Sequence, residues 1–259
     1  MGGYIQFADV EFRFVARAGT APLVLERFSL SIERGEFFCL LGPSGCGKTT
    51  VLNLLAGFER PSGGSLEVDG RPVVGPGVDR TVVFQGDDSL YTWLTAVENV
   101  EFGLRLAGAD AAARRATAER YLSLVGLSGQ GGKYPSELSG GMKQRIQIAR
   151  ALVCESPILL MDEPFAAVDA QTRSTLQDEL IGIWQTTRRT FLFITHDIGE
   201  SVLLADRIGI MTAGPAARMK VVVPVDLPRP RRRGDPAFGA LYERLHVIVS
   251  EEVRRRAAG

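Results

Sequence analysis

The chain has 259 residues, enough to bury a substantial apolar core as one large domain or two small ones. Its 30 Lys and Arg side chains balance its 30 Asp and Glu side chains, so no overall field favours DNA, RNA or anionic lipid. The three cysteines are odd in number and lack metal-binding spacing, which argues against a disulfide framework or a zinc site and favours a reducing cytosol.

Membrane insertion is not expected from the sequence. The N-terminus MGGYIQFADVEF lacks the basic start and apolar run of a signal peptide. No apolar stretch reaches the ~20 residues that span a bilayer. We therefore expect a soluble chain whose association with a membrane comes through a partner.

Strands and helices are predicted from the apolar pattern. Residues 4–14 and 28–32 alternate apolar and polar side chains, which is typical of half-buried antiparallel strands. Unbroken apolar runs predict strands of a parallel sheet that is covered on both faces. These runs are 37–41, 81–84, 158–162 and 190–195. Residues 90–155 show helical periodicity, which predicts an inserted helical subdomain.

The C-terminal part begins with a stretch rich in Pro and Arg and then resumes helical spacing. Residues 229–233, RPRRR, are expected to form a solvated loop, because the overall charge is balanced. A contact with lipid headgroups or nucleic acid is the alternative. The predicted domains are residues 4–226 and a C-terminal loop and helix at 227–259. The sequence has no internal repeat, so we do not expect two copies of the same domain in this chain.

The segment GPSGCGKTT lies between a predicted strand and a predicted helix, which is the context of a phosphate-binding loop. Gly42, Gly45 and Gly47 allow the backbone to wrap a polyphosphate with its amides pointing at the anion. Lys48 then places a cation beside the β- and γ-phosphates, and the Thr49 hydroxyl suits Mg²⁺. The predicted nucleotide-binding residues of this loop are Gly42, Pro43, Ser44, Gly45, Cys46, Gly47, Lys48, Thr49 and Thr50.

The segment ILLMDEP ends an apolar strand with two acidic residues. Ligands of open α/β folds bind at the carboxyl ends of the strands, where this motif places its carboxylates. Asp162 is expected to hold Mg²⁺ through water, and Glu163 to orient and deprotonate an attacking water. Two acids at a strand end are often merely solvated, and the upstream phosphate loop is what favours a function here.

The segment LSGGMKQRIQIARAL resembles the signature motif of ABC ATPases. Ser139 is placed to open a helix, and Gly140 and Gly141 to expose backbone amides toward an anion. In that family the motif reaches across a head-to-tail dimer to the γ-phosphate of the partner subunit's ATP. The resemblance implies an ATPase with an α/β P-loop NTPase (RecA-like) core, an N-terminal antiparallel β subdomain and an inserted α-helical subdomain, with ATP and Mg²⁺ as cofactors.

Further residues take family roles through this resemblance. Gln85 matches the Q-loop glutamine, which contacts Mg²⁺ and the attacking water, and His196 matches the switch histidine at the γ-phosphate. Asp169, in AAVD, matches the D-loop residue near the dimer seam. Phe14 is the best candidate for the aromatic residue that stacks on adenine, with Phe12 as competitor and a core role open for either.

The resemblance covers about residues 4–225, and its finer features are similar to importer ATPases for nitrate, sulfonate and taurine. It implies a peripheral subunit on the cytoplasmic face of the membrane that drives a separate permease. A second, identical ATPase subunit and an extracytoplasmic substrate-binding protein complete the expected complex. A non-transport ABC ATPase, as in DNA repair, is the alternative; the short gap before the signature, without heptads or Cys clusters, argues against it.

Two more expectations concern single side chains. Leu90, Tyr91, Trp93 and Leu94 are expected to line a groove for a short cytoplasmic helix of the permease, with packing inside the helical subdomain as the alternative. Thr92 stands where relatives usually have Pro, which leaves this partner contact open. Amide dipoles around Cys46 are expected to favour its thiolate, so that a maleimide inactivates the protein and ATP protects it.

Overall fold

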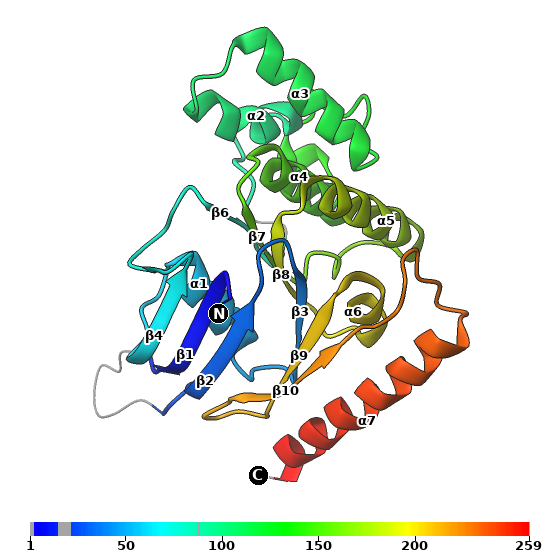
Figure 1. The fold of residues 1–259 in the computed structure, drawn as a ribbon. Helices are drawn as coiled ribbons and strands as arrows, with labels where there is room; N and C mark the ends of the chain where they lie inside the picture. The colour runs from blue at the N-terminus through cyan, green and yellow to red at the C-terminus, as the bar shows by residue number, and fades with distance from the viewer. Residues whose placement is uncertain (1–2, 15–21, 87–88, 259) are drawn as a thin grey trace. The chain divides into compact units, whose positions relative to one another are not determined.

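The computed structural model describes residues 3–14, 22–86 and 89–258 (Figure 1). It divides the chain into two compact units. The first unit comprises Met1–Gly77 and Arg188–Gly259, and the second comprises Val78–Thr187. Each unit has its own strands and helices and is described separately. The domain boundaries predicted from the sequence stay a prediction.

An antiparallel sheet in the first unit has the strand order β2-β1-β4-β5. Its strands are β1 (Ile5–Phe12), β2 (Leu25–Ile32), β4 (Gly63–Val68) and β5 (Arg71–Pro72). β1 pairs antiparallel with both β2 and β4, beside which it lies in Figure 1. A bulge near Asp9, whose φ is 45°, interrupts the alternation of buried side chains in β1. The half-buried strands predicted at 4–14 and 28–32 are thus confirmed.

A parallel sheet in the same unit places β3 (Phe37–Leu41) between β8 (Thr190–Ile194) and β9 (Arg207–Met211). The strand β10 (Met219–Pro224) pairs antiparallel with β9. Every residue of β3 and of β8 is buried, which is typical of strands covered on both faces. The strands predicted at 37–41 and 190–195 are therefore confirmed.

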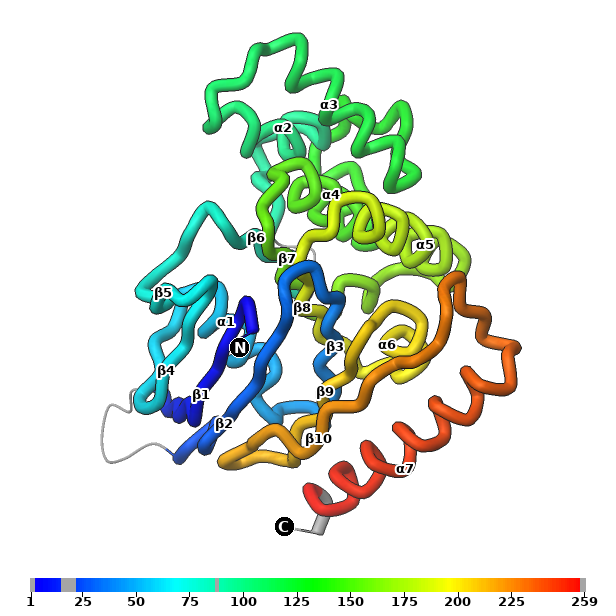
Figure 2. The backbone as a smooth tube through the Cα atoms, viewed as in Figure 1, coloured from blue at the N-terminus to red at the C-terminus, as the bar shows by residue number. Residues whose placement is uncertain are grey.

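Three helices complete the first unit: α1 (Lys48–Ala56), α6 (Ile198–Leu204) and α7 (Pro236–Ala258). α1 follows β3 directly and ends at Gly57, whose left-handed conformation allows its N–H to bind the Leu54 carbonyl. α7, red in Figure 2, runs back toward the loop between β9 and β10. The helix predicted for the C-terminal part is thereby confirmed.

The arginine-rich segment before α7 is only partly the solvated loop that the sequence predicts: Pro230, Arg232 and Arg233 are exposed, whereas Arg231 is buried. Arg231 is only 8% exposed. Its guanidinium donates to the carbonyl oxygens of Val202, Leu203, Ala205, Val225 and Leu227. Arg229 donates to Asp206 Oδ1 at 2.8 Å and to the Leu204 carbonyl at 2.6 Å. Because several of these carbonyls end α6, the segment caps that helix.

The second unit combines two parallel strands with a helical bundle. The strands are β6 (Arg80–Val83) and β7 (Ile158–Asp162). The helices are α2 (Ala96–Leu106), α3 (Ala111–Leu124), η1 (Pro135–Glu137), α4 (Gly140–Val153) and α5 (Ala170–Thr187). α2, α3 and α4 pack against one another, so the helical character predicted for 90–155 is confirmed.

The strands of the second unit differ in burial. β7 is buried along its whole length, but only the last residue of β6, Val83, is buried. The parallel pair is as predicted, whereas the expectation that 81–84 is fully covered is wrong. Among the described residues, the structure contains no helix that is long and apolar enough to cross a membrane.

Candidate functional site

The loop between β3 and α1 has the conformation of a phosphate-binding loop. Gly45 and Gly47 have φ of 71° and 97°, a left-handed conformation that glycine adopts without steric cost. A Cβ atom on Gly42 would lie 2.8 Å from Cys46 Sγ, so only glycine fits there. Within the described chain, no side chain caps the start of α1 at Gly47, and a helix N-terminus of this kind favours an anion.

Lys48 runs along the inside of this loop. Its Nζ donates to the carbonyl oxygens of Gly42 at 2.8 Å and Pro43 at 3.0 Å, and the side chain is buried. The Lys48 ammonium is therefore held by carbonyl groups of the phosphate-binding loop itself. Of the remaining predicted residues, Pro43, Cys46 and Thr50 are buried and Ser44, Gly45 and Thr49 are exposed.

Cys46 does not have the environment of a thiolate. Its side chain is 1% exposed, and burial raises the pKa of its thiol, an effect that the charge of Lys48 offsets only in part. A protonated, buried thiol is a poor nucleophile. The expectation of a reactive thiolate at Cys46 is therefore wrong.

In the second unit, β6 and β7 bring two predicted catalytic residues together. Glu163 follows the buried Asp162 at the end of β7, and its Oε2 accepts a hydrogen bond from Gln85 Nε2 at 3.3 Å. The φ of Glu163 is 46°, a left-handed conformation that costs an L-residue roughly 1–2 kcal/mol. Strain of this kind is often kept where the position of a side chain matters, and Glu163 has it together with six other non-glycine residues of the described chain.

Helix α4 holds the segment that follows Gln85, a connection that the sequence patterns did not predict. Gln147 Nε2 donates to the Gly86 carbonyl at 2.6 Å. Arg150 donates from Nη1 to the Ser89 carbonyl and from Nη2 to Ser89 Oγ, both at 2.9 Å. Their spacing along α4 puts both side chains on one face, which is the only signal in the sequence. The helix that carries the signature thus holds Gly86 and Ser89, which follow the Q-loop glutamine.

The signature residues form the start of α4, as predicted. Ser139 is the N-cap, and its Oγ accepts a hydrogen bond from the Met142 amide at 3.3 Å. A Cβ atom on Gly141 would lie 3.1 Å from the Ala167 carbonyl oxygen, so the first turn packs closely on the predicted D-loop. Asp169 is exposed, and the hydrogen bond from the Thr172 amide at 3.0 Å lowers the pKa of its carboxyl.

His196 follows β8 in the first unit and is exposed. Its neighbours fix the backbone on both sides. Thr195 Oγ1 donates to the buried Glu200 Oε2 at 2.7 Å and accepts from the Asp197 amide at 3.0 Å. Asp197 Oδ1 in turn accepts from the Glu200 amide and caps α6. This small network holds His196 at the junction between β8 and α6.

Two segments with aromatic side chains each divide between core and surface. Phe14 is 56% exposed and packs edge-on against the buried Phe12, with ring centroids 5.0 Å apart. This difference favours Phe14 as the stacking residue.

In the second unit, Leu90 is buried as the core alternative predicts, whereas Trp93 is 70% exposed. The centroid of the Tyr91 ring lies 5.4 Å from that of the Trp93 ring, so Tyr91 packs against the exposed tryptophan.

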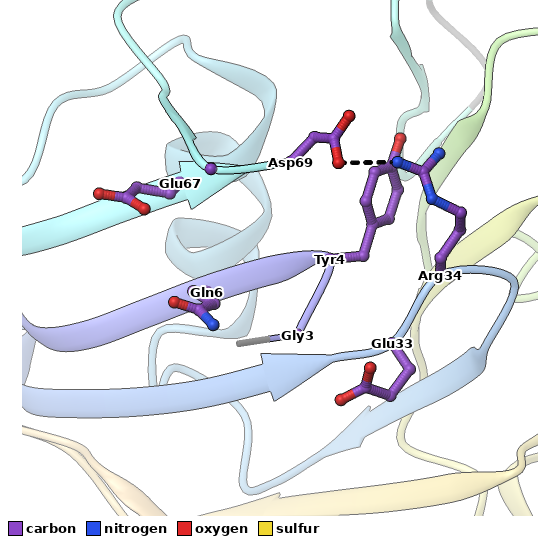
Figure 3. Close-up of a pocket in the computed structure, with 8 residues that line it drawn as sticks. Gly3, Tyr4, Gln6, Glu33, Arg34, Glu67 and Asp69 are labelled. Carbon is purple, nitrogen blue, oxygen red and sulfur yellow. Dashed lines mark hydrogen bonds and ion pairs between the residues drawn. The ribbon is translucent and has the colours of Figure 1, made fainter. Parts of the chain in front are cut away.

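A separate polar pocket of about 420 Å³ lies at the edge of the antiparallel sheet (Figure 3). The Arg34 guanidinium lies 3.8 Å from the centroid of the Tyr4 ring and donates to Asp69 Oδ1 at 2.8 Å. None of the predicted site residues lines this pocket. Among the described residues, no group of three His, Cys, Asp or Glu side chains forms a metal site.

Comparison with known proteins connects this geometry to a family. Residues 25–166 match the family described as ABC transporter. The nitrate import ATP-binding protein NrtD of Synechococcus elongatus is 42% identical over 259 residues, covering 99% of this chain and 93% of that protein. The bicarbonate transport ATP-binding protein CmpC of the same species is 40% identical over 260 residues, covering 98% of this chain and 39% of that protein.

A solved structure confirms the predicted fold class. It is a dimeric ATP-binding cassette in a post-hydrolysis state, bound to ADP and Pi, and it is 27% identical to this chain. Its TM-score is 0.78, and the likeness covers 86% of this chain and 100% of that one.

Proposed function

The chain belongs to the ABC transporter family and is an ATP-hydrolysing subunit of an importer, for which we propose a small organic or inorganic anion as cargo. Two relatives named for nitrate and bicarbonate support an anion, and the resemblance noted in the sequence extends the class to sulfonate and taurine. The names of these relatives do not favour a soluble, non-transport role.

The phosphate loop is the observation that carries the function. We infer that the amides of Gly45, Gly47 and Lys48 bind the phosphates of ATP, with the Lys48 ammonium beside the β- and γ-phosphates. Phe14 stacks on adenine. Ser139, Gly140 and Gly141 of the partner subunit face the γ-phosphate through the amides of the first turn of α4, and Asp169 lies near the dimer seam.

Hydrolysis follows from the residues at the ends of β6, β7 and β8. The Glu163 carboxylate takes a proton from the attacking water, and Gln85 orients that water and the carboxylate it binds. His196 contacts the γ-phosphate and stabilises the charge that develops on its oxygens. Loss of the γ-phosphate removes the anion that attracts the partner's signature, so the dimer opens after each turnover.

Magnesium fits the oxygen groups of this site. The Thr49 hydroxyl, the Gln85 amide oxygen and the Asp162 carboxylate are hard oxygen ligands, and Mg²⁺ needs few of these because it keeps several waters. When bound, the ion would neutralise charge on the β- and γ-phosphates. The positions of Thr49 in the first turn of α1 and of Asp162 at the end of a buried strand support this proposal.

The chain works with a permease and as a dimer, as importer subunits of this family do. We infer further that the second ATPase subunit is identical and that an extracytoplasmic binding protein supplies the cargo. The subunit lies peripherally on the cytoplasmic face of the inner membrane and reaches it through the permease. Its net charge of zero gives it no general attraction to anionic lipid.

Glu163→Gln tests this function. The change keeps the shape of the side chain but removes the base, so we expect ATP turnover to fall about 100-fold or more. ATP should then trap the variant as a dimer in size-exclusion chromatography, whereas Lys48→Ala should stay monomeric with ATP. A Glu163→Gln protein that remains monomeric and active would contradict the assignment of the base.

A further inference from the structure

The last turn of α7 contacts the phosphate loop. Arg256 Nη1 donates to the Ser44 carbonyl oxygen. Its Nη2 lies 3.4 Å from the position that a Cβ atom on Gly45 would occupy. The Arg256 charge also acts on Cys46, where it counters in part the effect of burial, which raises the pKa of that thiol. One guanidinium therefore lies against Ser44 and Gly45 of the loop.

This contact is supported by a built anchor one turn earlier in α7. Glu252 is 1% exposed and accepts hydrogen bonds from the Ala213 amide at 2.9 Å and from Lys220 Nζ at 2.8 Å. The loop that contains Ala213 itself abuts the phosphate loop, because a Cβ atom on Gly214 would lie 3.3 Å from the Gly45 carbonyl oxygen. The helix end is thus fixed to a segment that already touches the phosphate loop.

The chemistry of the contact suggests what it does. In a trans peptide the C=O and N–H groups point in opposite directions. A guanidinium that holds the Ser44 carbonyl therefore directs the Gly45 N–H away from α7. Phosphate-binding loops bind their anion through such N–H groups, and a charge-assisted hydrogen bond is strong enough to fix a flexible glycine peptide.

We propose that Arg256 is a positioning residue of the phosphate loop, which holds the Ser44–Gly45 peptide so that its N–H is oriented for the phosphates of ATP. α7 lies outside residues 25–166 that the family match covers, so the family match itself does not include this contact. The proposal rests on the function proposed above, because it requires that the loop binds ATP.

Arg256→Ala tests the proposal, with Arg254→Ala as the matched control. Arg254 is on the same helical turn, carries the same charge and donates to the Ser250 carbonyl of its own helix. We expect Arg256→Ala to raise the dissociation constant of a fluorescent ATP analogue, and the KM for ATP, roughly 3- to 10-fold, since one charged hydrogen bond is lost. The value of kcat and the melting temperature should change little, because the base and the core are untouched.

Arg256→Lys separates positioning from simple charge attraction. A lysine keeps the charge but loses the planar pair of donors, so we expect an affinity between those of wild type and Arg256→Ala. Equal affinity of Arg256→Ala and Arg254→Ala would overturn the proposal, as would full recovery by lysine. If the wild type itself failed to bind the analogue, so that it did not differ from Lys48→Ala, the proposed function would be wrong. This outcome is distinct from a failure of the proposal for Arg256.

Discussion

Phe12 and Phe14 show how strongly two neighbouring aromatic residues can differ in role. Phe12, the last residue of β1, is 3% exposed, and Phe14, two residues later, is 56% exposed. The ring of Phe12 packs edge-on against that of Phe14, so packing within the fold holds the Phe14 ring in place. A rigid, exposed ring is suited to stack on a flat base.

Replacing each phenylalanine by alanine separates these two roles. We expect Phe14→Ala to raise the KM for ATP about 3- to 10-fold with little change in melting temperature, because an aromatic contact with the base is lost. Phe12→Ala should lower the free energy of unfolding by roughly 3–5 kcal/mol through the cavity that it creates. ATPase kinetics and thermal denaturation of both variants provide the measurements. An unchanged KM in Phe14→Ala would assign adenine to another residue.

At this scale, the sequence predicted backbone conformation where it depends on neighbouring residues, and it failed where burial comes from distant segments. The phosphate loop was predictable because its glycines, lysine and threonine are adjacent and its strand and helix flank them. Cys46 and Arg231 were misjudged, because the groups that surround them come from elsewhere in the chain. For Arg231 these are carbonyls at the end of α6, about 26 to 29 positions away.

Among the elements, α7 is docked by buried apolar side chains, such as Phe238 and Leu245, and by the buried carboxylate of Glu252. Burial alone would raise the pKa of Glu252, but the hydrogen bonds from Lys220 and the Ala213 amide and the charges of Lys220 and Arg255 together lower it below the ordinary 4.5. The pKa of Lys220 is raised in turn, chiefly by its hydrogen bond to Glu252. Each group thus keeps the other charged in the folded chain.

This pair gives the docking of α7 a defined dependence on pH. Because the pKa of Glu252 is lowered on folding, its stabilisation is complete above pH 4.5 and is lost as the pH falls through the lower folded value. We expect Glu252→Gln to lower the free energy of unfolding by roughly 1–3 kcal/mol at neutral pH and by much less in acid. Denaturant unfolding of both proteins at several pH values measures the difference.

Glu251→Gln is the matched control for this experiment. Glu251 also accepts a hydrogen bond from Lys220, at 3.0 Å, but its side chain is half exposed. Exposed ion pairs contribute at most ~1 kcal/mol, so this variant should follow wild type closely at all pH values. If the two variants behaved alike, the anchor of α7 would have to lie elsewhere.

Elements with continuous apolar runs were predictable, and those whose cover depends on neighbours were less so. β3, β7 and β8 carry the runs and are buried throughout. β6 has a similar run but buries only its last residue, because burial of a strand depends on what packs over it and not on its own sequence. The hydrogen bonds from α4 to the segment after Gln85 are equally invisible in the sequence.

Across the whole molecule, the predicted functions are distributed over both compact units. The first unit carries Phe14, the phosphate loop and His196, and the second carries Gln85, Glu163 and the signature. The zero net charge gives the chain no general attraction to anionic lipid. Attachment to a transporter therefore depends on a specific surface, and an exposed aromatic residue is the usual centre of such a surface.

Trp93 is the residue on which we expect this attachment to depend. Its ring is 70% exposed, and Tyr91 supports it from one side while the Asn99 side chain binds the backbone of Tyr91 and Leu94. Trp93→Ala should weaken capture of the subunit by its purified permease roughly 10-fold or more, because a buried aromatic anchor is lost from the interface. Leu106→Ala is the control. This exposed residue ends α2, about 15 Å along the helix axis from the first residue of that helix, and loss of its side chain should leave capture unchanged. Both variants should melt as wild type does, since neither side chain is buried, and equal capture of the two would place the permease on another surface.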